Sequence, residues 1–92
     1  MSAEEAREQL RQVEGWELSS DGTSISKSWS RKHFKDAIEF VNRVADIAEA
    51  EQHHPDIHLT GYKKVRIALT THAIGGLSEN DFILAAKIDD AA

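Results

Sequence analysis

Histidines and carboxylates gather in one part of this 92-residue sequence. His53 and His54 are adjacent and precede Pro55, Glu49 lies four residues before His53, and His72 follows later. Imidazoles titrate near neutral pH, so several of them around one cleft can both accept and donate protons. This composition favours a reaction that removes a proton from one atom and protonates a leaving hydroxyl group at another.

Two carboxylates belong to the same set of residues, and one of them, Glu49, could orient an imidazole. Residues four apart on a helix are neighbours, which would bring Glu49 to His53. Asp81 follows Ser78 by three residues, the spacing of a helix capping box, so it either caps the last helix alone or also lies near a polar ligand there. Three histidines with Glu49 could instead bind zinc, but the spacing does not match the helical two-histidine zinc motif. We therefore expect no metal.

The elements that position these residues follow from the apolar spacing. In order they are a helix ending at Gly15, strands over 16–18 and 25–30, a helix over 33–51, strands around 57–59 and 65–69, and a helix over 82–88 capped by Ser78. Hairpins with helices stacked on one face predict an α+β fold, a two-layer sandwich with a four-stranded antiparallel sheet and the order α-β-β-α-β-β-α. His72 would end the last strand, beside the Gly75-Gly76 loop. The length fits a single domain over 1–92.

The long helix carries more apolar residues than one face needs. Its main stripe is formed by Phe34, Ala37, Ile38, Val41, Val44, Ala45 and Ala48. Phe40 and Ile47 lie off that stripe and are one heptad apart, so we interpret them as a second seam that contacts another subunit. The last helix is apolar all round, which also favours a subunit contact. A homodimer and a homotetramer both fit two such seams.

The composition excludes several classes of function. Apolar residues make up 40% and charged residues 29% of the chain, which is typical of a soluble globular protein. The absence of cysteine removes disulfides, thiol nucleophiles and cysteine-based metal sites. A net charge of −5 disfavours direct nucleic-acid binding. No apolar run is long enough to cross a membrane, and the acidic N-terminus lacks a signal-peptide core, so we expect a cytoplasmic location.

The chain resembles the pterin-4a-carbinolamine dehydratase family from about Trp16 to Ile88. The residues that carry the resemblance are, in order, Glu49, His53-His54-Pro55, Tyr62, His72 and Asp81. The resemblance implies helices on a four-stranded antiparallel sheet. It also implies dehydration of a 4a-hydroxytetrahydropterin to the quinonoid dihydropterin, which recycles the pterin of aromatic amino-acid hydroxylases. The pterin is the substrate, and neither a cofactor nor a metal is needed.

The resemblance also implies roles for individual residues. His53, His54 and His72 match the family's catalytic histidines, and Glu49, Pro55 and Asp81 match positions that bind or orient the substrate. We expect His54 and His72 to flank the C4a–N5 edge as the acid/base pair, with His53 oriented by Glu49.

Other features of the sequence qualify the resemblance. Tyr62 is interpreted as an aromatic that packs on the sheet rather than as a catalytic acid. Ala73 stands where many members carry an acid, and Ile57 where animal members carry a tryptophan, so the substrate preference could differ. Some relatives act in dimerisation of a transcription factor or in assembly, so a non-catalytic protein-interaction module on the same scaffold is the alternative function.

Overall fold

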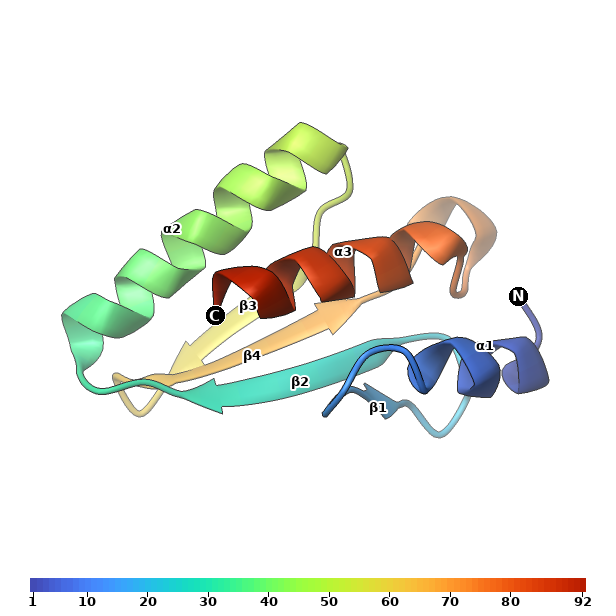
Figure 1. The fold of residues 1–92 in the computed structure, drawn as a ribbon, viewed down its shortest axis with the longest axis horizontal. Coiled ribbons are helices and arrows are strands. Elements are labelled where there is room, and N and C mark those ends of the chain that lie inside the picture. The colour runs from blue at the N-terminus through green and yellow to red at the C-terminus, as the bar shows by residue number, and fades with distance from the viewer.

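The helices and strands follow the predicted order, with one short helix that the sequence did not predict. The computed structural model describes all 92 residues (Figure 1). The elements are α1 (Ala3–Leu10), β1 (Glu17–Leu18), β2 (Ile25–Ser30), α2 (Phe34–Glu51), β3 (Asp56–Thr60), β4 (Lys64–Leu69), the 3₁₀ helix η1 (His72–Ile74) and α3 (Glu79–Ala91). The predicted α+β class is confirmed.

The four strands form an antiparallel sheet in the order β1-β2-β4-β3. Val65, Ile67 and Leu69 alternate along β4 and are fully buried on one face of the sheet. Figure 1 shows α2 and α3 over that face. Asp56, the first residue of β3, pairs with Ala68 near the end of β4. The loop that enters β3 and the loop that leaves β4 therefore lie at the same end of the sheet.

The buried side of α2 differs from the predicted stripe. Phe40 is fully buried, and its ring centroid lies 5.0 Å from that of Trp29 on β2. Ile47 is partly buried and packs against the same core, whereas Phe34 is 55% exposed. The prediction that Phe40 and Ile47 form a subunit seam is therefore wrong. The helix is rotated so that this side meets the sheet, because the Trp29 ring occupies the space beneath it.

The last helix packs inward through Phe82, Leu84, Ala85 and Ile88, as predicted for one of its faces. Lys87 joins it to α2 through an ion pair with Glu51 at 2.8 Å. Ile83 is 46% exposed, and a subunit contact on that side stays a prediction. None of the three helices combines the length and the apolar character needed to cross a membrane.

Two carboxylates, the exposed Asp21 and the half-buried Asp36, accept hydrogen bonds at the ends of secondary-structure elements. Before α2, the backbone N–H of Lys32 donates to Asp36 at 3.0 Å, and this bond, followed by the Arg31 guanidinium, lowers the pKa of Asp36. In the β1–β2 turn, the Ser19 hydroxyl donates to Asp21 at 2.7 Å and lowers its pKa, with further bonds from Thr23. Both carboxylates therefore stabilise the fold in their ionised form.

The lowered pKa values give stability a defined pH dependence. The contribution of Asp21 is present above its ordinary pKa of 3.8 and is lost as the pH falls through its lower folded value. We expect Asp21→Asn to lower the free energy of unfolding at about pH 6, with a smaller difference from the wild type at about pH 2.5. Urea unfolding at both pH values measures this. Asp46→Asn is the control because Asp46 is exposed. Equal effects of the two variants at about pH 6 would contradict the prediction.

Candidate active site

The end of α2 turns His53 away from the helix axis. Gln52 adopts the left-handed conformation, with φ of 50°, and the backbone N–H of His53 donates to the carbonyl of Ala48 at 3.1 Å. This pattern is typical of a helix C-terminus that ends in a left-handed residue. Because the chain then reaches Pro55, the helix cannot continue, and His53 and His54 leave it in different directions.

His53 contacts the carboxylate of Asp81, at the start of α3. Its Nε2 atom lies 2.5 Å from Oδ1 of Asp81, and the Asp81 side chain is fully buried. The other carboxylate oxygen, Oδ2, accepts hydrogen bonds from the Thr71 hydroxyl at 2.9 Å and from the backbone N–H of Ser78 at 3.0 Å. Asp81 therefore caps α3, as predicted, and also holds His53, which was not predicted.

This network determines which nitrogen of His53 carries a proton. An ionised carboxylate only accepts hydrogen bonds, so the close contact with Asp81 places the proton on Nε2. Nδ1 of His53 makes no hydrogen bond within the chain and keeps its lone pair when the ring is neutral. The same logic operates in Ser–His–Asp triads, where a buried aspartate fixes the tautomer of the base. His53 is thus arranged to accept a proton at Nδ1.

The predicted contact between Glu49 and His53 is wrong. Oε2 of Glu49 lies 3.6 Å from Nε2 of His54 instead, and the two side chains are 78% and 65% exposed. That distance is longer than a hydrogen bond, and exposed ion pairs of this kind contribute little. The left-handed Gln52 explains the difference, because it moves His53 out of the helical position in which it would face Glu49.

His72 begins η1 rather than ending a strand, because β4 stops at Leu69. The loop around it is closed by the backbone N–H of Thr71, which donates to the carbonyl of Gly76 at 2.8 Å. Gly75 takes a left-handed φ of 64° there, which suits glycine. The His72 side chain is exposed and makes no hydrogen bond or ion pair within the chain, which leaves its nitrogens free for a ligand.

Pro55 and Tyr62, which also carry the resemblance, lie at opposite ends of the β3–β4 hairpin. Pro55 is half-buried immediately before β3 and so belongs to the same loop as His53 and His54. Tyr62 lies in the β3–β4 turn, at the opposite end of the hairpin, with a left-handed φ of 54° and 60% exposure. The interpretation of Tyr62 as an aromatic that packs on the sheet is therefore wrong.

Thr71 also contacts Asp81, although its place beside His72 in the sequence predicts no role for it. Its hydroxyl bonds both Asp81 and Ser78, the latter at 2.7 Å. The available signal was its place beside His72, at the end of an alternating strand. A hydroxyl group at such a position gives no sign of a partner ten residues further along the chain.

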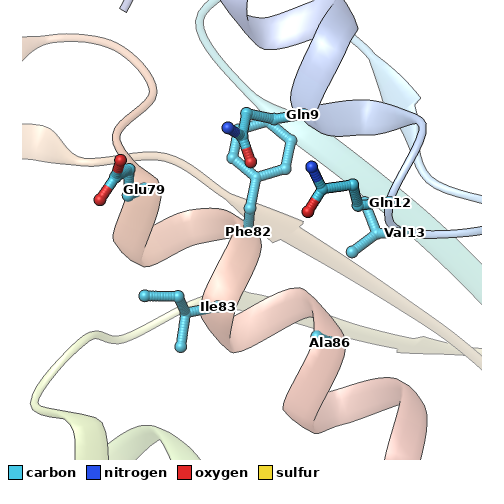
Figure 2. Close-up of a pocket in the computed structure, with 7 residues that line it drawn as sticks. All are labelled: Gln9, Gln12, Val13, Glu79, Phe82, Ile83 and Ala86. Carbon is cyan, nitrogen blue, oxygen red and sulfur yellow. The ribbon is translucent and has the colours of Figure 1, made fainter.

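None of the hollows in the structure is lined by His53, His54 or His72. A hollow of about 240 Å³ lies elsewhere, between α1 and α3, and Figure 2 shows the side chains that line it. They are Gln9, Gln12, Val13, Glu79, Phe82, Ile83 and Ala86. None of these residues is a histidine, so this hollow is not part of the candidate acid/base site. No group of three or more His, Asp or Glu side chains is close enough together to hold a metal ion.

Comparisons with known proteins identify the family of the chain. Residues 1–91 match the family described as pterin 4 alpha carbinolamine dehydratase. Pterin-4-alpha-carbinolamine dehydratase 2, mitochondrial, of Arabidopsis thaliana is 51% identical over 92 residues, which cover 98% of this chain and 49% of the plant protein. A putative pterin-4-alpha-carbinolamine dehydratase of Halorhodospira halophila is 49% identical over 89 residues, covering 97% of this chain and 81% of that protein. The chain therefore spans about half the length of the Arabidopsis relative.

A solved structure supports the same assignment. The crystal structure of a transcriptional coactivator/pterin dehydratase from Brucella melitensis superimposes with a TM-score of 0.92 at 32% identity, covering 100% of this chain and 97% of that one. The fold, the motif residues and the identity to relatives of similar name lead to one conclusion. The chain belongs to the pterin-4α-carbinolamine dehydratase family, whose name describes a hydro-lyase.

Proposed function

We propose that the protein dehydrates a 4a-hydroxytetrahydropterin to the quinonoid dihydropterin by histidine acid/base catalysis, without a metal or a cofactor. In this reaction the C4a–O bond breaks, the hydroxyl group leaves as water after protonation, and N5 loses its proton as the C4a=N5 double bond forms. One group must therefore accept a proton while another donates one. Recycling of the pterin of aromatic amino-acid hydroxylases is the corresponding role.

The observation that carries this proposal is the pair formed by His53 and the buried Asp81. A neutral His53 offers Nδ1 as a proton acceptor, and Asp81 stabilises the imidazolium that results. We assign the acceptor role at N5 to His53, in place of the acid/base pair of His54 and His72 expected from the sequence. His54 and His72, whose side chains are exposed, are the candidates for donating a proton to the leaving hydroxyl group. Pro55 would shape the loop that receives the pterin.

Stopped-flow absorbance measurement of 4a-hydroxytetrahydropterin dehydration tests the proposal. We expect the wild-type rate to exceed the spontaneous rate and to be unchanged by a chelator. Each of His53→Ala, His54→Ala and His72→Ala should slow turnover, because one positioned acid or base is worth about 10²–10⁴-fold. His58→Ala is the control, since His58 is an exposed histidine of β3 outside the cluster. A wild-type rate equal to the spontaneous one would refute the enzymatic function.

Glu49 is expected to matter little to this reaction. Its side chain is 78% exposed and 3.6 Å from His54, and such pairs are worth about 0–1 kcal/mol. Glu49→Gln should therefore change kcat/KM by less than about fivefold. The same stopped-flow assay, with Glu51→Gln as a control from the same helix turn, measures the effect. A loss as large as that of His53→Ala would show that Glu49 acts on the substrate directly.

A protein-interaction role is the second candidate. It is favoured by the Brucella melitensis relative, whose name joins a transcriptional coactivator to a pterin dehydratase. Such a role could coexist with catalysis, and it would become the main one if no dehydration were measured. We further propose that the protein forms a homodimer or homotetramer and does not bind nucleic acid directly. The cytoplasmic location stays a prediction, and the Arabidopsis relative is named as mitochondrial.

A further inference from the structure

We propose that Thr71 is a positioning residue for the reaction, which aligns His53 through Asp81 and sets where His72 stands relative to it. This inference rests on the proposed dehydratase function. Thr71 would not touch the pterin. Its hydroxyl group would hold the buried carboxylate, and its backbone would hold the loop that carries His72.

The hydroxyl groups around Asp81 can be arranged in only one way that satisfies them all. Thr71 donates its single proton to Oδ2 of Asp81, at 2.9 Å. The 2.7 Å contact between the Thr71 and Ser78 hydroxyl oxygens must then use the proton of Ser78. The bonds run from Ser78 to Thr71 to Asp81, and His53 donates to the carboxylate from the other side. We call this series the hydroxyl–carboxylate chain.

The hydroxyl–carboxylate chain fixes both the position and the charge of the Asp81 side chain. Asp81 is fully buried, and a buried carboxylate needs hydrogen-bond donors to remain ionised. Without the Thr71 hydroxyl, Oδ2 would keep only the backbone N–H of Ser78. The carboxylate could then rotate, and the preference of His53 for a proton on Nε2 would weaken. Nδ1 would carry the proton in part of the molecules and could not act as a base in them.

The backbone of Thr71 carries the second part of the argument. Its N–H donates to the Gly76 carbonyl at 2.8 Å, and its carbonyl accepts from Ile74 at 3.2 Å. These two bonds close the small loop in which His72 is the next residue. One residue is therefore bonded through its side chain to the partner of His53 and through its backbone to the loop of His72. The distance between the two histidines depends on it.

Thr71→Val and Thr71→Ser form a matched pair of variants. Valine keeps the branched shape and removes the hydroxyl group, whereas serine keeps the hydroxyl group and removes a methyl group. We expect Thr71→Val to lower kcat about tenfold, the usual worth of one hydrogen bond to a charged group, with KM changed less than about twofold. Thr71→Ser should recover most of the wild-type kcat. Thr71→Ala carries the same test if the valine variant does not fold.

Nitrogen-15 NMR of the His53 ring gives a readout that is independent of turnover. At about pH 8.5, where an ordinary imidazole is neutral, we expect the Nε2–H tautomer in the wild type and in Thr71→Ser, and a mixture of tautomers in Thr71→Val. Thr70→Val is the control, because the Thr70 hydroxyl donates to the Thr23 carbonyl at 2.6 Å and to the Gly76 carbonyl at 3.4 Å, and not to Asp81. It should leave the tautomer and kcat unchanged, whatever it does to stability.

Two results would overturn the inference. One is a Thr71→Val protein with the wild-type tautomer and the wild-type kcat. The other is a Thr70→Val protein that loses as much kcat as Thr71→Val, since the loss would then be a general effect of perturbing this strand end. If the wild type itself does not accelerate dehydration, the proposed function fails. The NMR comparison alone then decides whether Thr71 aligns His53.

Discussion

Asp81→Asn is expected to lower the rate of dehydration about 10²–10⁴-fold while leaving the protein folded. The asparagine oxygen can still accept from Ser78 and Thr71, so the cap of α3 can persist. Its NH₂ group would then face Nε2 of His53, and because that group only donates, Nε2 would have to accept. The proton of His53 would move to Nδ1, the atom that must be free to act as a base. Stopped-flow turnover of the purified variant, with circular dichroism to verify folding, measures the effect.

Asp89→Asn supplies a matched control on the same helix. Asp89 also accepts two side-chain hydrogen bonds, from Trp16 at 3.0 Å and from Lys27 at 2.8 Å, and its side chain is 24% exposed. It lies eight residues beyond Asp81, about 12 Å along the helix. We expect Asp89→Asn to reduce stability with little change in turnover. If Asp81→Asn retained the full rate, or if both variants lost the same activity, His53 would not depend on its carboxylate partner.

Much of the fold could be predicted because its signals are local. Ser2 and Glu5 form a capping box at the start of α1, and Asp81 accepts from the Ser78 backbone as predicted for α3. Each of these pairs spans three residues, so the helix geometry alone brings them together. The alternation along β4 likewise gave its buried face, since successive side chains of a strand point to opposite sides.

The rotation of α2 could not be read from the sequence. Apolar residues occur around more than half of this helix, so their positions do not determine which side meets the sheet. The deciding feature is the Trp29 ring, which packs against Phe40. With Phe40 buried, Phe34 and Ala45 move toward solvent, and Glu49 lies on that exposed side with them.

The partners of His53 show a second limit of prediction from sequence. The predicted contact between Glu49 and His53 follows from a local rule, which is that residues four apart on a helix are neighbours. The observed partner, Asp81, is 28 residues away, and the two meet only because β3 and β4 return the chain to the end of α2. The residues of the candidate site could thus be named in advance from the motif. Their pairing could not, because it depends on how the hairpin and α3 are placed.

Phe40→Glu is expected to unfold the protein. Removing a buried phenylalanine ring costs about 3–5 kcal/mol, and burying a carboxylate in its place adds several more. The total is comparable to the whole stability of a typical domain, about 5–15 kcal/mol. The guanidinium carbons of Arg31 and Arg43 lie 5.0 and 5.9 Å from the Phe40 ring centroid, yet neither replaces the contact with Trp29. Circular dichroism and urea unfolding measure the loss.

Phe34→Glu distinguishes this explanation from a subunit seam, because it makes the same chemical change on the same helix at a position that is 55% exposed. We expect Phe34→Glu to remain folded with a change in unfolding free energy below about 1 kcal/mol, since substitutions at exposed positions are usually small in effect. Phe40→Leu, which stays apolar, should fold with an intermediate loss of stability. A folded Phe40→Glu protein of reduced molecular mass would restore the seam interpretation. That outcome would require Phe40 to face a second subunit. In the structure Phe40 is instead fully buried within one chain and packs against Trp29.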